Sequence, residues 1–395
     1  MSRVDFLAAR LEGLLPIGGG PDGTTRLPWT AEDEAAGRWF REQAAAAGLR
    51  VERDPAGNLW AVPDAPPPWW ALGSHLDTVR QGGSYDGALG VAAAFEVAAG
   101  ARVPVAVISF ADEEGARFNT PTFGSRALSG SLDPSVLARL DVDGVSLADA
   151  MRSAGVDPAG LAAGSEWLSR LRGFVELHVD QTPELEQARR PVGIVRRLVA
   201  RLRLRADLSG RAGHSGTTPP TERRDALAAA ARLIVAAQDL VPEPPLVATA
   251  SRIEVEPNAL TTVPARARVW LDARAPEPEA VRSWRARLER VASEIADRTE
   301  VAITLSVESE NAGSEFDPGL RERLTRLSGE LGEPAREVEC YAGHDAGVLA
   351  ARVPAAMVLV RNPSGVSHSP EEAVDLEAAA FGVELLRRLV EEVAE

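Results

Sequence analysis

Residues Gly73–Gly87, which read GSHLDTVRQGGSYDG, hold side chains whose types and spacing suit a divalent metal. His75 and Asp77 alternate with apolar or small neighbours directly after the apolar run Trp69–Leu72. Alternating residues at the end of a strand point the same way, so we expect His75 and Asp77 to share a face. Asp86 follows in a glycine-containing turn that would direct its carboxylate to the same place. This donor set predicts a metal site, and a hydrated polar loop is the alternative.

Two further polar clusters follow runs that predict strands. Val103–Phe110 is typical of a strand buried on both faces, and it leads into Ala111-Asp112-Glu113-Glu114-Gly115. Gly173–Val179 predicts another strand, with His178 near its end. Open α/β sheets place their chemistry at the carboxyl ends of strands, so these acids and this histidine are expected to form a site.

The five histidines of the chain all lie in glycine-rich or acid-rich surroundings. Histidines scattered through a core would not share such surroundings, which favours a functional role for the set. They are His75, His178, His214, His344 and His368.

Length and composition limit the functional class. The 395 residues suffice for two domains, and 45% hydrophobic with 26% charged residues is typical of a globular protein. A net charge of −15 without a basic block argues against nucleic acid and anionic membrane as partners. The absence of lysine excludes Schiff-base catalysis, and no apolar run approaches a membrane span. With Cys340 as the only cysteine and no signal-like segment, we expect a reducing, cytoplasmic location.

Hydrophobic periodicity predicts the elements that position these residues. We expect helices over 2–15, 31–49, 90–99 and 318–331, a hairpin over 49–62, strands around 336–340 and 355–361, and a final amphipathic helix from about Leu376. The β-branched segment Val192–Asp207 is expected to cross into a second domain.

The order of elements in that second domain resembles a ferredoxin-like unit. We expect a strand (198–206), a helix (223–239), two strands (247–255 and 262–273), a helix (276–296) and a strand (301–308). The prediction is therefore an α/β protein with a discontinuous catalytic domain, residues 1–199 and 315–395, around an inserted α+β domain, residues 200–314.

The polar clusters occur in a characteristic order, namely HLD with YDG, DEEG, ELHVDQ, GRAGHSGTTPP, YAGHDAG and GVSHSPEE. This series, from about residue 30 to 375, resembles the N-carbamoyl-L-amino-acid hydrolase, β-ureidopropionase and allantoate amidohydrolase family of the dinuclear metallopeptidase/aminoacylase superfamily. The resemblance implies a metallopeptidase-like catalytic domain with a central mixed sheet and an inserted lid and dimerisation domain.

The resemblance also implies two divalent metal ions per subunit. Zinc or manganese is expected, and cobalt or nickel would also suit the donors. Asp86 would bridge the ions and Asp77 would orient the ring of His75 through its far nitrogen. The implied ligands are His75, Asp86, Glu114, His178 and His368.

Catalytic and substrate-binding roles follow from the same resemblance. Glu113 would be the general base, and His214 would be an oxyanion donor that reaches the neighbouring subunit of a homodimer. The substrate, a small molecule with a free carboxylate, would contact Gln181, Asn258, Arg274, Gly343 and His344.

The implied reaction is hydrolysis of a linear ureido C–N bond, with an N-carbamoyl-L-amino acid converted to the amino acid, carbon dioxide and ammonia. Allantoate hydrolysis is the first alternative. An aminoacylase or dipeptidase is the second, although many peptidase relatives carry an acid where this chain has His178. A non-catalytic metal-binding protein is the alternative from another class, and the complete ligand set argues against it.

The chain departs from the usual motifs of that family at three places. Asp180 and Thr182 replace glutamate and glycine, Tyr341 follows Cys340 where small residues are usual, and Arg361 precedes the last motif. We expect these residues to lie near the substrate side chain.

Overall fold

The computed structural model describes residues 3–241 and 245–394. The chain divides into unit 1, Met1–Arg196 with Glu315–Glu395, and unit 2, Arg197–Ser314, so the division lies within three residues of the expected boundaries. The N–H of Phe316 donates to the carbonyl oxygen of Arg196 at 3.1 Å, which brings the two ends of unit 1 together at the insertion. The roles expected for the units, catalysis for one and lid and dimerisation for the other, stay predictions.

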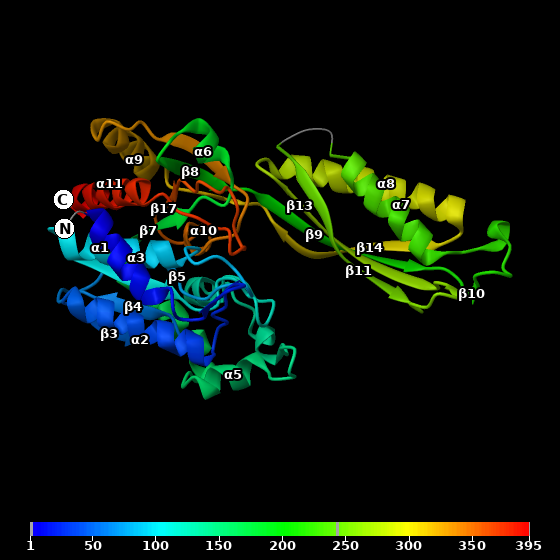
Figure 1. The fold of residues 1–395 in the computed structure, drawn as a ribbon, viewed down its shortest axis with the longest axis horizontal. Coiled ribbons are helices and arrows are strands. Elements are labelled where there is room, and N and C mark those ends of the chain that lie inside the picture. Colours follow the sequence, from blue (N-terminus) through cyan, green and yellow to red (C-terminus); the bar gives the residue numbers. More distant parts are fainter. Residues whose placement is uncertain (1–2, 242–244, 395) are drawn as a thin grey trace. The chain divides into compact units, whose positions relative to one another are not determined.

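Unit 1 supplies all of the elements on either side of the insertion (Figure 1). Before it come α1 (Arg3–Leu14), β1 (Gly19–Gly20), β2 (Gly23–Thr24), α2 (Ala31–Ala46), β3 (Arg50–Arg53), β4 (Leu59–Val62), β5 (Trp69–His75), α3 (Ala88–Gly100), β6 (Val105–Phe110), α4 (Phe123–Ser129), α5 (Leu147–Ser153), β7 (Leu171–Val179), α6 (Glu184–Ala188) and β8 (Val192–Leu198), with 3-10 segments at Pro134–Ala138 and Pro158–Arg170. After it come β15 (Ser314–Glu315), α9 (Pro318–Glu330), β16 (Arg336–Cys340), α10 (Asp345–Leu349), β17 (Ala355–Val360) and α11 (Leu376–Ala394).

Most of these elements match the expectations from the sequence. The hairpin is β3 with β4, and α2 begins at the expected N-cap Thr30, whose hydroxyl accepts from the N–H of Asp33. Helix α1 matches the first expected helix from Arg3 on, and Ser2 lies outside the described residues. The segment expected to cross between domains consists of two strands, β8 and β9 (Ala200–Ser209), which belong to different sheets.

The central sheet of unit 1 is mixed, as expected. Its strand order is β15-β8-β17-β7-β5-β6-β4-β3, and β16 pairs with β8. Neighbours β17, β7, β5 and β6 are parallel, while β8 is antiparallel to β17, β4 to β6 and β3 to β4. The carboxyl ends of the parallel strands therefore meet at one edge, where His75 ends β5 and His178 lies one residue before the end of β7.

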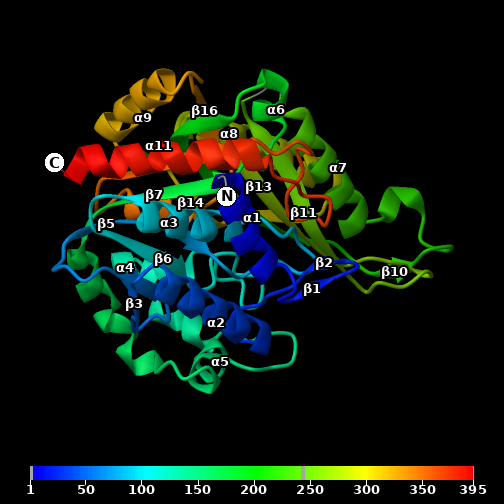
Figure 2. The same cartoon turned by 60° about the vertical axis from the view of Figure 1, so that its left-hand side comes forward.

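Helices cover both faces of this sheet. On one face α1, α3 and α11 contact one another (Figure 2), and Val175 and Leu177 of β7 point into that layer. Glu176 points to the opposite face, where one of its oxygens accepts from the N–H of Ala346 in α10 at 2.9 Å. Within residues 3–241 and 245–394, no helix is long and apolar enough to cross a membrane.

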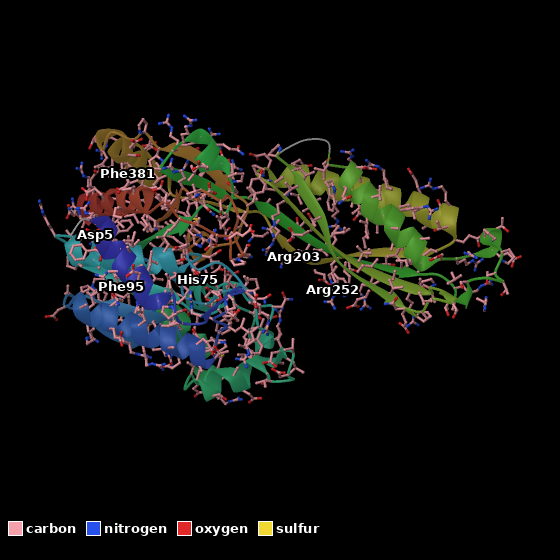
Figure 3. All side chains as sticks on the ribbon, in the orientation of Figure 1. Asp5, His75, Phe95, Arg203, Arg252 and Phe381 are labelled. Atoms are coloured by element: carbon pink, nitrogen blue, oxygen red, sulfur yellow. The ribbon has the colours of Figure 1, made fainter. Side chains whose placement is uncertain are left out.

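Unit 2 is an antiparallel sheet with the strand order β11-β13-β9-β14. Helices α7 and α8 pack on one face through residues such as Leu204, Leu233 and Trp284, and Arg203 and Arg252 project from the other (Figure 3). This is the expected βαββαβ order. The elements are β9, β10 (Gly213–His214), α7 (Ala226–Asp239), β11 (Val247–Glu256), β12 (Thr262–Val263), β13 (Arg266–Ala275), α8 (Pro278–Thr299) and β14 (Ala302–Asn311), with a 3-10 turn at Pro220–Glu222.

Helix α3 packs directly onto β5 and β7, and a glycine permits the close approach. A Cβ at Gly90 would lie 2.2 Å from the carbonyl oxygen of Leu177 and 2.8 Å from Cβ of Ser74. Both distances are shorter than van der Waals contact, so the backbone of α3 touches the strands that carry His75 and His178.

We therefore predict opposite effects for two alanine substitutions in this helix. Gly90→Ala overpacks the contact and should lower the free energy of unfolding by about 1–3 kcal/mol. Gly100→Ala is the control, because a Cβ there meets nothing closer than Cδ of Arg387 at 3.7 Å and should be neutral or stabilise by up to about 1 kcal/mol. Urea unfolding measures both, and equal stabilities would contradict the packing described.

Candidate metal centre

The rings of His75 and His178 are oriented by backbone carbonyl groups. Nδ1 of His75 lies 2.9 Å from the carbonyl oxygen of Asp77, and Nδ1 of His178 lies 2.9 Å from that of Val179. Because a carbonyl oxygen only accepts hydrogen bonds, Nδ1 carries a proton in both rings. Both Nε2 atoms are thereby presented to Asp86.

The role expected for the Asp77 carboxylate needs correction. We expected it to bond the far nitrogen of His75, but its nearer oxygen lies 3.6 Å from Nδ1, which instead contacts the Asp77 backbone. The carboxylate accepts from the N–H groups of Glu113 and Glu114, both at 3.1 Å. Strand β5 ends at His75, so the alternation that we extended to Asp77 stops before it. Asp77 therefore connects the His75 segment to the two glutamates.

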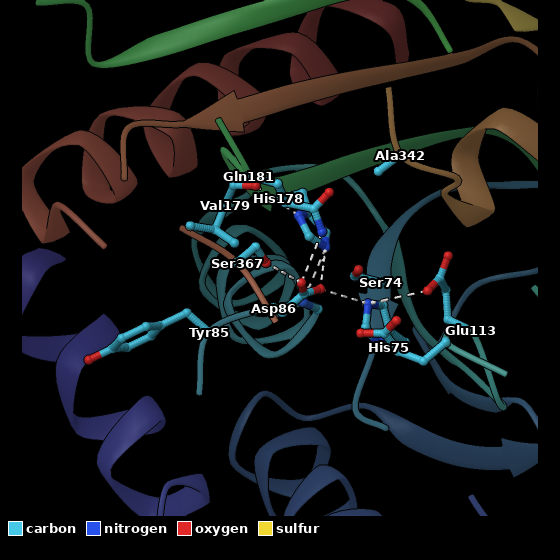
Figure 4. Close-up of polar contacts among 12 residues, drawn as sticks. Ser74, His75, Tyr85, Asp86, Glu113, His178, Val179, Gln181, Ala342 and Ser367 are labelled. Atoms are coloured by element: carbon cyan, nitrogen blue, oxygen red, sulfur yellow. Dashed lines mark hydrogen bonds and ion pairs between the residues drawn. The ribbon is translucent and has the colours of Figure 1, made fainter. Parts of the chain in front are cut away.

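The carboxylate of Asp86 faces two different sets of side chains (Figure 4). Its Oδ1 lies 3.0 Å from Nε2 of His178 and 3.4 Å from Nε2 of His75. Its Oδ2 lies 3.5 Å from Nε2 of His368, and accepts from Gln181 at 2.9 Å and Ser367 at 2.8 Å. Each oxygen of Asp86 thus faces a different set of side chains, as expected for a carboxylate that bridges two metal ions.

Glu113 and Glu114 point to different imidazoles although they are adjacent. Oε1 of Glu114 lies 3.2 Å from Nε2 of His368, whereas Oε2 of Glu113 lies 3.9 Å from Nε2 of His75. The turn that follows them contains Gly115, whose φ is +64° and where a Cβ would lie 2.4 Å from the nitrogen of Pro121. Only glycine fits this turn.

The donor atoms form groups in which one ion could be bound. His75, Asp86 and His178 make a buried group, and Asp86 with Glu114 and His368 makes a partly exposed one. A third, buried group consists of Glu176, His178 and His344 and shares His178 with the first. Nε2 of His75 and Oε1 of Glu114 are buried and have no hydrogen-bond partner among the described residues. Buried polar atoms of this kind are satisfied by metal coordination, so the residues fit divalent ions.

The pKa values of the imidazoles show that positive charge is favoured beside Asp86. Burial opposes protonation of His178, but the charge of Asp86 outweighs it and raises the pKa of His178 to about 9. The same balance, with Asp86 and Glu113 as partners, raises the pKa of His75 well above its ordinary value. Glu114 raises the pKa of His368. A proton or a metal ion between Nε2 and the carboxylate supplies this charge.

Glu113 is set apart from the other acids by its environment. Burial raises the pKa of Glu113 well above its usual range, and the nearby charges of Asp345 and Glu114 act in the same direction. Glu113 is also absent from all three groups of candidate ligands. A buried carboxyl that holds a proton readily and is not needed as a ligand is suited to proton transfer.

His344 lies beside the buried group of ligands. Its ring centroid is 4.4 Å from that of His178, and neither of its nitrogens has a hydrogen-bond partner among the described residues. Burial and the charge of His178 hold the pKa of His344 well below its ordinary value, so the ring is neutral at neutral pH. It therefore offers one donor and one acceptor to a bound molecule. Gly343 precedes it, and a Cβ there would meet no atom within 4 Å.

Sequence reasoning missed two buried glutamates. Glu176 accepts from the hydroxyl of Ser74 at 2.7 Å and from Ala346, and thereby ties β5 and β7 to the segment that carries His344. Its position two residues before His178 on the same strand was a usable signal. Glu372 accepts from the N–H of Asp86 at 3.0 Å, and only its sequence proximity to His368 pointed to it.

The expected site residues of unit 2 lie on β10, on β13 and on an exposed segment before β12. His214 ends β10, and its Nδ1 accepts from the N–H groups of Gly216 at 3.0 Å and Thr217 at 3.2 Å. The neutral ring therefore carries its proton on Nε2, as a hydrogen-bond donor requires. Asn258 is exposed, and Nε of Arg274 donates to Asp272 on the same strand at 2.7 Å.

Two of the residues that depart from the family motifs, Asp180 and Arg361, have structural partners, and their expected nearness to the substrate side chain stays a prediction. The carboxylate of Asp180 accepts from the N–H groups of Thr182 and Leu185 at the start of α6, at 2.9 and 3.2 Å. Arg361 pairs with Asp375 and with Glu186. Both side chains are thus engaged in local structure, while Tyr341 is half-buried.

Comparison with known proteins identifies relatives over the whole chain. Residues 71–392 match peptidase family M20/M25/M40. An N-carbamoyl-L-amino acid amidohydrolase from Geobacillus stearothermophilus is 36% identical over 100% of both chains. Allantoate amidohydrolase from Escherichia coli is 30% identical over 94% of this chain and 93% of that one. Among solved structures, AtUAH in complex with glyoxylate superposes with a TM-score of 0.87 at 27% identity, covering 100% of this chain and 98% of that chain.

The raised pKa of His178 predicts that divalent metal binding depends on pH. At pH 7 a ring with a pKa of about 9 must lose a proton before Nε2 can bind an ion. Affinity for Mn²⁺ should therefore rise by up to about tenfold per pH unit for each proton displaced, and level off near pH 9. Calorimetric titration of metal-free protein between pH 6.5 and 8.5, in buffers of different protonation enthalpy, measures both affinity and proton release. An affinity that stays constant over this range would contradict the prediction.

Proposed function

Because the chain belongs to peptidase family M20/M25/M40, we propose that it is a metal-dependent amidohydrolase that hydrolyses an N-carbamoyl-L-amino acid. Cleavage of the linear ureido group by water would yield the L-amino acid, carbon dioxide and ammonia. The observation that carries the proposal is the Asp86 carboxylate, whose oxygens face separate ligand groups beside Glu113. The 36% identity to the Geobacillus amidohydrolase, over the full length of both chains, supports the substrate class.

Two divalent ions would be held by the ligands around Asp86. His75 and His178 would bind one ion with Oδ1, and Glu114 and His368 would bind the other with Oδ2. Ions in these places would polarise the substrate carbonyl and lower the pKa of bound water. The donor set suits zinc or manganese, and also cobalt or nickel.

Glu113 would move the proton of the reaction. Its carboxylate would accept a proton from the attacking water and deliver it to the leaving nitrogen. The buried position that raises its pKa supports the second step, because a protonated carboxyl is then retained until the nitrogen takes the proton. Asp77 would keep Glu113 in place through the hydrogen bond to its N–H.

The remaining side chains would bind and orient the substrate. Gln181, Gly343 and the neutral ring of His344 would line the pocket next to the ligands. From unit 2, Asn258 and Arg274 would bind the substrate carboxylate, and Nε2 of His214 would donate to the developing oxyanion. We propose that the protein is a homodimer in which His214 serves the neighbouring subunit.

Allantoate is the second candidate substrate. Support comes from the 30% identity to allantoate amidohydrolase of Escherichia coli over nearly the whole chain. The same ligands and the same Glu113 would serve this ureido acid, so the substrate is distinguished by the residues around its side chain and carboxylate.

A substrate panel tests the proposal. Manganese-loaded protein should release ammonia from N-carbamoyl-L-amino acids, and metal-free protein should not. Ammonia from allantoate alone would assign the second candidate. Activity only toward N-acetyl amino acids or dipeptides, measured as free amine, would establish an aminoacylase or dipeptidase. Absence of turnover on all of these, with metal bound, would reject an amidohydrolase of this substrate range.

Substitution of the proposed general base should separate catalysis from metal binding. Glu113→Gln should lower kcat by about 10²–10⁴-fold, because the amide cannot accept the proton. Metal content should stay at the wild-type value, because Glu113 is in none of the candidate ligand groups. Glu371→Gln, at an exposed position, is the matched control and should keep wild-type activity. Retention of activity within tenfold by Glu113→Gln would assign the proton transfer to another group.

A further inference from the structure

The side chain of Glu372 contacts the loop that carries Asp86. Its Oε1 accepts from the N–H groups of Tyr85 at 2.8 Å and Asp86 at 3.0 Å. The side chain is 7% exposed, so these bonds are shielded from water. Two backbone groups of the loop are therefore fixed by one carboxylate that comes from a segment more than 280 residues away in the sequence.

The second oxygen of Glu372 reaches the side chain of Asp86 through a serine. The hydroxyl of Ser367 lies 2.9 Å from Oε2 of Glu372 and 2.8 Å from Oδ2 of Asp86, and it can donate its one proton to either of these oxygens, one at a time. Ser367 immediately precedes His368, the ligand that faces the same Oδ2. Glu372 thus connects the backbone position of Asp86, the direction of its Oδ2 and the segment that carries His368.

The loop that carries Asp86 leaves space for the side chain of Glu372 at Gly83. A Cβ at Gly83 would lie 2.2 Å from Cδ of Glu372 and 2.6 Å from its Cβ. Any side chain at position 83 would displace the carboxylate from the loop. Gly83 is therefore needed for the close approach between the two segments.

The two candidate metal positions depend on this contact to different degrees. His75 and His178 are fully buried on strands β5 and β7, and their rings are oriented by the carbonyl groups of Asp77 and Val179. The side chain of His368 is 49% exposed and belongs to an irregular segment. The position at His368 thus has fewer fixed supports of its own.

We propose that Glu372 is a positioning residue that holds Oδ2 of Asp86 toward Glu114 and His368 and thereby sets the affinity of the more exposed metal position. The inference rests on the pair of ions in the proposed function, but not on the identity of the substrate. In this proposal Glu372 contacts neither a metal-binding histidine nitrogen nor the substrate. It acts through Asp86 and Ser367.

Metal titration of substituted proteins tests this role without any assay of activity. Metal-free wild-type protein, titrated calorimetrically with Mn²⁺, should bind two equivalents. In Glu372→Ala the first equivalent should bind as in the wild type and the second about 10–100-fold more weakly, as is typical when a residue that supports a ligand is lost. Glu372→Gln keeps an oxygen that accepts from Tyr85 and Asp86, and should bind the second equivalent more tightly than Glu372→Ala.

The control variant is Glu371→Ala, whose side chain is exposed and which should bind both equivalents as the wild type does. Ser367→Ala removes only the bridge to Oδ2 and should weaken the second equivalent selectively. It also carries the test if Glu372→Ala does not fold.

Three outcomes would overturn the inference. Wild-type binding of both equivalents by Glu372→Ala, or by Ser367→Ala where that variant carries the test, would show that Asp86 needs no such support. Equal weakening of both equivalents would assign Glu372 to the stability of unit 1 as a whole. A wild-type protein that binds a single ion would reject the metal pair and this inference together, whereas the first two outcomes leave the metal pair intact.

Discussion

Several buried acidic side chains lie close together around Asp86, and the structure of the candidate metal centre depends on how their negative charge is compensated. Asp77, Asp86 and Glu113 are buried, and transfer of ionised carboxylates from water is costly unless cations compensate. The rings of His75 and His178, whose pKa values are raised, supply part of this compensation. The fully buried Arg26, whose Nε donates to the carbonyl oxygen of Leu76, supplies more. Metal binding at this site would therefore be coupled to the folding of the region, because the same cationic charge would serve both.

The sheet brings the ligands together from distant parts of the sequence. Parallel strands end at a common edge, where His75 is the last residue of β5 and His178 the last but one of β7. Buried strands leave little freedom at that edge, so His75 and His178 are fixed by the fold itself. The acidic residues instead lie on turns, where Gly83, Gly87 and Gly115 allow the backbone to approach; a Cβ at Gly87 would lie 2.5 Å from the ring of His75.

Much of this arrangement could be predicted from the sequence. The β-branched runs identified the buried strands, and the position of the polar clusters at their ends identified the edge that carries the site. The role of the Asp77 carboxylate could not be predicted, because it depends on where β5 stops, and alternation holds only within a strand. Glu372 escaped notice because two of its three partners are backbone N–H groups of a distant loop, which leave no pattern in the residues nearby. For Asp180 and Arg361, comparison of motifs showed a difference but not the direction of the side chains.

The hydrogen bond between Phe316 and Arg196 has an evolutionary consequence. An inserted segment whose two ends meet can be gained, lost or exchanged without rethreading the host chain, because the host strands close over the same gap in either case. Strands β9 and β14 are likewise neighbours, so the inserted unit closes on itself as well. Changes in unit 2 can therefore be accommodated without altering the path of the unit 1 chain that carries the candidate ligands.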